Sequence, residues 1–147
     1  MSEGEHIEVE PDTYGTATAP DWLSTTGTDS CIAVGIADDA SRRAWLCHDS
    51  SIAEDGSTLQ KMLDEAVSPG GNSLQIWILG GKMRAGSEES VRLASLAAIA
   101  LVRAAAPHAN ITNRLGVGQG DIVLIFEAGC WKLYEEPDEG LTPGDLL

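Results

Sequence analysis

The sequence predicts an α+β domain in which a β-hairpin and further strands combine with two helices. Apolar, β-prone residues over 31–48 and 74–79 indicate strands, and apolar residues at helical spacing over 57–67 and 88–106 indicate helices. The chain has 147 residues, of which 43% are hydrophobic, so a single domain can bury a sizeable core. We therefore expect one globular α+β domain.

Three segments with different compositions suggest the organisation of the chain. Residues 1–20 are acidic and then rich in Thr, Ala and Pro, with few large apolar side chains to repay the entropy of ordering. We expect them to form a flexible acidic lead. Residues 21–135 are expected to form the domain, and residues 136–147 a polar C-terminal tail. The segment from Trp22 is expected to lead into the hairpin, with a turn at Gly27.

The hairpin consists of the runs CIAVGIA (31–37) and RAWLCH (43–48), with the polar, turn-like insert 38–42 between them. A turn centred between Asp39 and Ala40 would place Cys31 directly opposite His48 on one sheet face. The same face then carries Ala33, Gly35, Ala44 and Leu46. The opposite face carries Ile32, Val34, Ile36, Trp45 and Cys47. The prediction is a bulky core face and a face of mainly small residues that holds the thiol and the imidazole.

The middle of the chain is expected to supply one helix and one strand. Residues 57–67 have the spacing of an amphipathic helix that packs on a sheet, and the sequence SPGGN (68–72) ends it. LQIWIL (74–79) reads as a buried strand, and Gly80 and Gly81 after it allow close approach of the backbone.

The C-terminal part begins with the longest predicted element, a helix over 88–106. Its first residues, Glu88 and Glu89, suit the positive end of the helix dipole, and Pro107 ends it. This helix is apolar on most faces, so we expect it to be well buried. ITNRLGV, DIVLIFEA and CWKLY then predict a closing set of strands.

Composition argues against several classes of partner. The formal net charge of −14 repels nucleic-acid backbones and anionic membrane surfaces. No apolar run approaches the roughly 20 residues that span a bilayer, and the N-terminal sequence lacks the features of a signal peptide. We therefore expect a cytoplasmic location and no role in nucleic-acid or membrane binding.

The sequence suggests neither a disulfide framework nor a metal site, and we expect no cofactor. The three cysteines are an odd number without a C-x-x-C pair. Alternation places Cys47 in the core, and Cys130 is interpreted in the same way. Four further groups are interpreted as solvated or structural: His6, His108, the G-x-G-x-G run of Gly116, Gly118 and Gly120, and the acidic cluster at Glu135, Glu136, Asp138 and Glu139.

Cys31 and His48 are the candidate catalytic pair. A thiol with a pKa near 8.5 is mostly protonated at neutral pH, and an adjacent imidazole can accept its proton to leave a nucleophilic thiolate. Hydroxyl side chains that could orient the imidazole precede the cysteine at Thr25, Thr26 and Thr28. Taken alone, a Cys and a His on neighbouring strands are more often packing residues, so a structural role stays open.

The motif T-x-x-x-x-S-C, with Thr25, Ser30 and Cys31, followed by His48, resembles the signature of the CheD chemoreceptor glutamine deamidases. Their relatives include protein N-terminal asparagine amidohydrolases and, more distantly, the cytotoxic necrotizing factor toxins. ILGGKM (78–83) and the segment DIVLIFEAGCWKLY are similar to later parts of these families. Two departures from the pattern are Asp29, where the deamidases usually carry Gly, and the sequence HDSS at His48.

The resemblance implies packed mixed β-sheets, sandwich-like and flanked by helices. It also implies a cysteine amidohydrolase with Cys31 as nucleophile, His48 as base and Thr25 as the orienting hydroxyl. Ammonia would leave a carboxamide through a thioester intermediate. Backbone N–H groups near Ser30 and Cys31 are expected to bind the oxyanion, and Gly27 to let this loop bend.

Three functions remain open at this point. The first is deamidation of glutamine or asparagine side chains in proteins or peptides. The second is hydrolysis of an N-terminal asparagine, which needs a pocket for a free α-amine; the acidic charge mildly favours such a substrate. The third, motivated by Asp29, is a non-catalytic protein-binding module on the same scaffold.

Overall fold

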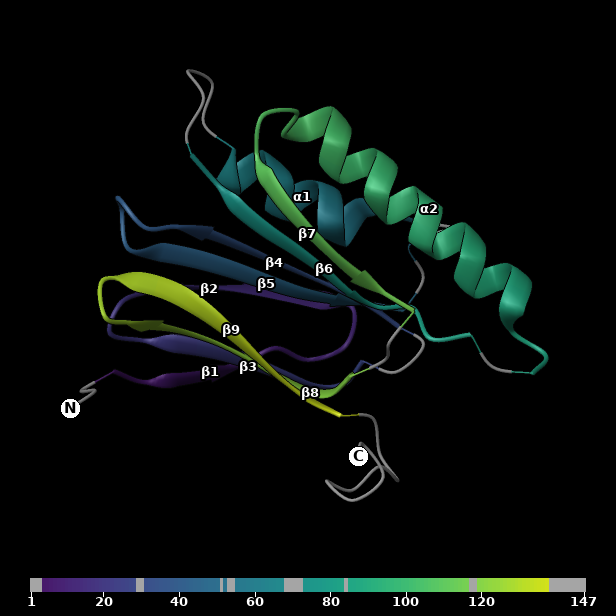
Figure 1. The fold of residues 1–147 in the computed structure, drawn as a ribbon, viewed down its shortest axis with the longest axis horizontal. Helices are drawn as coiled ribbons and strands as arrows, with labels where there is room; N and C mark the ends of the chain where they lie inside the picture. Colours follow the sequence, from purple (N-terminus) through teal and green to yellow (C-terminus); the bar gives the residue numbers. More distant parts are fainter. Residues whose placement is uncertain are drawn as a thin grey trace.

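Two β-sheets and a layer of helices stack on one another in the computed structural model (Figure 1). The structure describes residues 4–28, 31–50, 52, 55–67, 73–83, 85–116 and 119–137. The outer sheet has the strand order β1 (His6–Glu8), β3 (Trp22–Thr28), β8 (Gln119–Glu127) and β9 (Cys130–Pro137). The central sheet has the order β2 (Thr13–Thr18), β5 (Arg43–Asp49), β4 (Ile32–Asp38), β6 (Gln75–Gly80) and β7 (Asn110–Leu115).

Both sheets are mixed. β1 pairs in parallel with β3, β6 pairs in parallel with β7, and the other neighbouring strands are antiparallel. Two helices, α1 (Ser57–Ala66) and α2 (Glu88–Ala105), cover the face of the central sheet that points away from the outer sheet (Figure 1). The predicted α+β class with packed mixed sheets is therefore confirmed. Neither described helix is long and apolar enough to cross a membrane.

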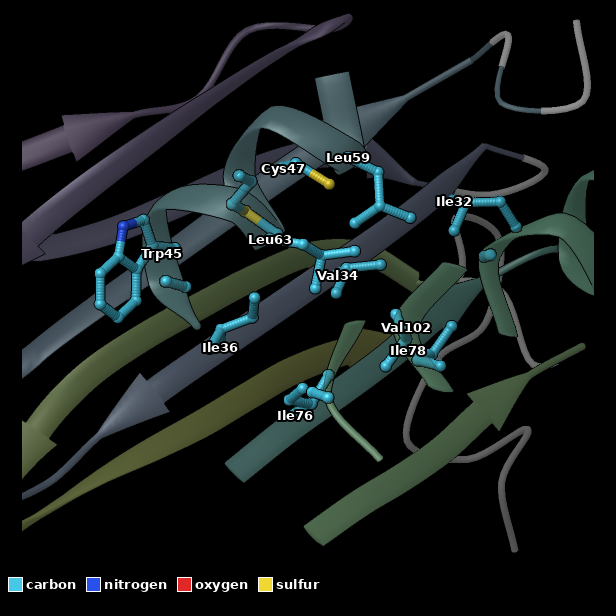
Figure 2. Packing of buried hydrophobic residues seen from close by; sticks show 14 of the residues in the cluster. Ile32, Val34, Ile36, Trp45, Cys47, Leu59, Leu63, Ile76, Ile78 and Val102 are labelled. Carbon is cyan, nitrogen blue, oxygen red and sulfur yellow. The ribbon is translucent and has the colours of Figure 1, made fainter. Parts of the chain in front are cut away.

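One core lies between the central sheet and the helices, and we call it the helix-facing core. Cys47 and Leu63 lie among aliphatic side chains from β4, β6, α1 and α2 (Figure 2). Its fully buried members include Ile36, Leu59, Met62, Leu63, Ile76 and Ile78. At its edge, the carboxylate of Glu65 accepts hydrogen bonds from Tyr14, Arg43 and Trp45 and so fixes α1 to β2 and β5.

A second core fills the space between the two sheets, and we call it the inter-sheet core. The hairpin β4–β5 contributes mostly small residues here, whereas the outer sheet contributes larger ones. Its buried members are Val9, Ala17, Leu23, Ala33, Ala37, Ala44, Leu46, Leu79, Ile122, Leu124 and Trp131. Both hairpin faces are therefore composed as the alternation of the sequence predicted.

The expected flexible lead over residues 1–20 is wrong for residues 4–20. They supply β1 and β2, and β2 forms an edge of the central sheet through six paired residues with β5. Val9 and Ala17 are buried in the inter-sheet core. Because ladder hydrogen bonds to β5 and burial under the outer sheet stabilise this segment, its own lack of large apolar residues does not prevent folding.

The domain therefore begins before residue 21, and β9 extends it to Pro137. Trp22–Thr28 is a strand, β3, rather than the expected lead into the hairpin. The rest of the predicted tail, residues 138–147, lies outside the described residues.

The helices begin and end within two residues of their predicted bounds, but α2 is not buried on most faces. Only Val91, Ala98 and Val102 are buried, while Leu93 and Leu96 are 46% and 53% exposed. α2 forms an outer layer, so it contacts the protein along one stripe only.

Candidate active site

Cys31, His48 and Thr25 come from three strand segments that meet at one end of the sandwich. Cys31 immediately precedes β4, His48 is the penultimate residue of β5, and Thr25 lies on β3 of the other sheet. The first residue of β4, Ile32, pairs with Asp49 on one side and with Gly80 on the other. The candidate site therefore lies where the beginning of β4 meets the ends of β5 and β6.

The predicted register of the hairpin is wrong by two residues. Ala33, not Cys31, lies opposite His48. The reason is the turn: Asp38 pairs with Arg43, and the four residues 39–42 connect the strands. The side chain of Asp38 stabilises this longer turn by accepting hydrogen bonds from the backbone N–H of Ala40 and the hydroxyl of Ser41.

The shift by two residues leaves the predicted faces unchanged, because side chains alternate with a period of two. Cys31 precedes the partner of His48 by two residues, which makes it a diagonal neighbour rather than a directly opposed one. Diagonal neighbours of this kind have Cα atoms roughly 7–8 Å apart. The half-buried thiol of Cys31 thus belongs to the same end of the hairpin as the imidazole.

Thr25 and His48 form a hydrogen bond across the inter-sheet space. Thr25 Oγ1 lies 2.8 Å from His48 Nδ1 and also 2.8 Å from the carbonyl oxygen of Val9. The threonine is fully buried, and His48 is 2% exposed. The carbonyl can only accept, so the single hydroxyl proton is donated to Val9, and Thr25 Oγ1 accepts from Nδ1–H of His48.

This arrangement selects one tautomer of the neutral ring. With its proton on Nδ1, His48 has a basic lone pair on Nε2. A histidine whose Nδ1–H is held by a hydrogen bond and whose Nε2 is basic is the form that a general base needs. The geometry can therefore support proton transfer at Nε2.

Burial and charge act on His48 in opposite directions. Removal of the ring from water lowers the pKa of His48, because the charged form loses hydration. The carboxylates of Asp12 and Asp49 oppose this effect by attracting the imidazolium. The net result is a lowered pKa, so the neutral, proton-accepting ring is favoured.

Asp12 is a residue of the site that the sequence analysis missed. Its backbone N–H donates to the carbonyl oxygen of His48 at 2.6 Å. Its carboxylate accepts hydrogen bonds from the backbone N–H and the hydroxyl of Ser50, at 2.9 and 2.8 Å. These hydrogen bonds from Ser50 lower the pKa of Asp12 and keep it ionised. The only sequence feature at this position is Asp in a turn-like Pro-Asp pair, which is common in ordinary loops.

The two glycines after β6 allow the backbone to approach Cys31, as the sequence suggested. Gly81 N–H donates to the carbonyl oxygen of Cys31 at 3.0 Å. A Cβ atom on Gly80 would lie 2.0 Å from the same oxygen, and Gly80 has a φ of +84°. Both the space and the backbone conformation therefore require glycine at this position.

The expected oxyanion loop is described only in part. Ser30 lies outside the described residues, as does Asp29. Gly27 lies within β3 and has a φ of +72°, and a Cβ atom there would meet no atom within 4 Å. Glycine is therefore favoured at position 27 by the backbone conformation and not by a lack of space for a side chain.

Cys47 is chemically different from Cys31. It is fully buried in the helix-facing core, as alternation predicted, and burial raises the pKa of its thiol to about 12. Cys130 is a half-buried free cysteine at the start of β9, next to the turn after β8. The expectation that it lies in the core is therefore wrong.

No group of three or more His, Cys, Asp or Glu side chains within the described ranges could hold a metal ion. His6 stacks on Trp22 and hydrogen-bonds Ser24 through Nε2. His108 lies with Val67, Leu74 and Pro107 around a small apolar cavity of about 60 Å³ at the end of α2. Neither histidine belongs to the candidate site.

No protein-family model matches the chain, and no curated protein matches it in a sequence search.

Proposed function

We propose that this chain is a cysteine-dependent amidohydrolase that deamidates glutamine or asparagine carboxamides of proteins or peptides. The observation that carries the proposal is the buried hydrogen bond between Thr25 and His48, which joins the two sheets at the end of the sandwich where Cys31 lies. Burying an imidazole in an apolar layer is costly unless its polar atoms are satisfied. A hydroxyl that fixes the ring as the Nδ1–H tautomer suits a base acting through Nε2.

In the proposed reaction, His48 accepts the proton of Cys31, and the thiolate attacks the carboxamide carbon. The C–N bond breaks, the imidazolium gives its proton to the departing ammonia, and a thioester remains. The imidazole then removes a proton from water, which adds to the thioester carbonyl. The C–S bond breaks, and the imidazolium returns its proton to the sulfur of Cys31. The amide has become a carboxylic acid, which loses its proton to the released ammonia and leaves a carboxylate.

The surroundings of the two groups suit this sequence of steps. The lowered pKa of His48 keeps the ring neutral at the pH at which it must accept a proton. Asp12 and Asp49 stabilise the imidazolium once it has formed. The resemblance of Thr25, Cys31 and His48 to the deamidase signature supports the same assignment of roles.

The test is hydrolysis of three synthetic peptides that carry an internal glutamine, an internal asparagine or an N-terminal asparagine. Ammonia release and the amide-to-acid mass change are measured with the wild type, Cys31→Ser and Cys47→Ser. We expect activity on at least one peptide, its loss in Cys31→Ser, and its retention in Cys47→Ser, because Cys47 is sealed in the helix-facing core.

The pattern of substrates separates the alternatives. Hydrolysis of only the N-terminal asparagine peptide would identify the protein as an N-terminal asparagine amidohydrolase. Activity that survives Cys31→Ser would contradict the thiol mechanism. No ammonia from any peptide, together with a Cys31 thiol that reacts no faster than a free cysteine, would favour a binding module.

A further inference from the structure

We propose that Asp12 positions His48 for its reaction with the Cys31 thiol, by fixing the end of β5 and by placing a carboxylate beside the imidazolium. This inference rests on the proposed function. Asp12 lies in the segment 1–20 that was expected to be a flexible lead, so this segment would contribute to the site.

Asp12 forms hydrogen bonds to two residues at the end of β5. Its backbone N–H binds the carbonyl oxygen of His48, and its carboxylate binds both the backbone N–H and the hydroxyl of Ser50. His48 and Ser50, which Asp12 binds, lie on either side of Asp49, the last residue of β5, which is 2% exposed. The end of the strand is thus held at His48 itself and at Ser50, two residues further along the chain.

Asp12 is itself held in place by the chain around it. It directly precedes β2, whose first residue, Thr13, pairs with His48. Asp12 has a φ of +63°, a left-handed conformation that aspartate adopts more readily than most residues. The hydroxyl of Thr58, on the first turn of α1, contacts the Asp12 carbonyl oxygen at 3.5 Å. The carboxylate is therefore fixed by its own backbone as well as by Ser50.

Asp12 also contributes a negative charge that acts on His48. The charged groups that act on the ring are Asp12 before β2 and Asp49 on β5, while β3 supplies the uncharged Thr25. Asp49 is buried, whereas Asp12 lies at the surface and remains ionised through its hydrogen bonds to Ser50. When His48 takes the proton of the thiol, the carboxylate of Asp12 stabilises the resulting imidazolium.

Two variants separate geometry from charge. Asp12→Asn keeps a side-chain oxygen for the backbone N–H of Ser50 but removes the charge. Asp12→Gly accepts the left-handed backbone conformation but removes the whole side chain. Glu89→Gln removes one negative charge from an exposed residue of α2 that forms an ion pair with Arg92, and it is the matched control.

The experiment measures the pKa of His48 by NMR and the rate of Cys31 alkylation by iodoacetamide at neutral pH. For Asp12→Asn we expect a lower His48 pKa than in Glu89→Gln and an alkylation rate reduced roughly 2- to 5-fold, as for loss of a partly exposed charge partner. For Asp12→Gly we also expect faster hydrogen exchange of the Ser50 amide. Asp12→Glu keeps the charge, so its His48 pKa should lie between the values of Asp12→Asn and the wild type.

The outcomes distinguish this inference from the proposed function. If His48→Ala slows Cys31 alkylation but Asp12→Asn changes neither the His48 pKa nor the rate, the role of Asp12 is overturned and the dyad stands. If the His48 pKa changes in the Asp12 variants but His48→Ala leaves the Cys31 alkylation rate unchanged, the proposed function is overturned. The coupling of Asp12 to His48 is then supported.

Discussion

The two faces of the β4–β5 hairpin have opposite characters. The helix-facing side carries Ile32, Val34, Ile36, Trp45 and Cys47, and it is sealed by α1 and α2. The side toward the outer sheet carries mainly small residues and ends in His48. Neighbouring residues on one strand, Cys47 and His48, therefore lie in different environments.

The difference shows how one hairpin can serve both stability and chemistry. Large aliphatic side chains on one face bury much apolar area and leave no room for water. Small residues on the other face let the second sheet approach closely enough for Thr25 to reach His48. We infer that the helix-facing side mainly stabilises the fold, while the other side holds the candidate site.

The largest effect on stability is expected for Leu63→Ala in the helix-facing core. Leu63 is fully buried, so its loss leaves a cavity and should lower the free energy of unfolding by roughly 3–5 kcal/mol. Chemical denaturation measures this loss. Where the variant remains folded, the His48 pKa should match the wild type; a displaced pKa would contradict the independence of the two faces.

The next effect is expected for Gly80→Ala, which acts directly at the site. The left-handed backbone costs about 1–2 kcal/mol for a residue with a Cβ atom, and overlap with the Cys31 carbonyl costs about 1–3 kcal/mol more. Gly129→Ala is the matched control, since its φ is +88° and a Cβ atom there meets nothing within 4 Å. Denaturation should show a larger loss for Gly80→Ala, accompanied by changed Cys31 alkylation; equal losses would contradict the close approach.

Thr25→Val tests the polar end of the inter-sheet core. Removal of the hydroxyl leaves the Val9 carbonyl and His48 Nδ1 without their partner and should cost about 1–3 kcal/mol. NMR of the ring nitrogens should also show a less uniform Nδ1–H tautomer. Thr25→Ser keeps the hydroxyl and should retain the tautomer, and an unchanged ring in Thr25→Val would refute the orienting role.

The smallest effect concerns pH. The pKa of His48 is lowered in the folded protein below its ordinary value of 6.5, so the unfolded chain binds more protons in that window. The free energy of unfolding should therefore fall as pH drops through about 6.5 toward the lowered pKa. Equilibrium denaturation across this range should show a shallower fall for His48→Gln; identical slopes would argue against the buried neutral ring.

The sequence was sufficient to predict what depends on local pattern. The alternation of residues 31–37 and 43–48 assigned both hairpin faces, because side chains of a strand must alternate. Helical spacing and the flanking glycines and prolines located α1 and α2 within two residues. The sequence did not predict the hairpin register, because the polar insert 38–42 is compatible with turns of several lengths.

The parts that were missed depend on contacts distant in sequence. β1, β2 and β3 are rich in Thr and Gly or too short for a clear pattern. Their order comes from pairing with other strands: β1 with β3, β2 with β5, and β3 with β8. Asp12 enters the site only because β2 lies beside β5. Thr25 was indicated by the family resemblance, and its contact with His48 follows from the packing of two sheets.

The measurement that tests the central claim most directly is the pH dependence of alkylation at Cys31, Cys47 and Cys130, in the wild type and in His48→Ala. The account predicts that Cys31 reacts selectively with a depressed apparent pKa, that His48→Ala abolishes this behaviour, and that Cys47 stays protected in both proteins. A slow Cys31 that His48 does not influence would contradict an activated dyad and leave the hairpin as a structural or binding feature.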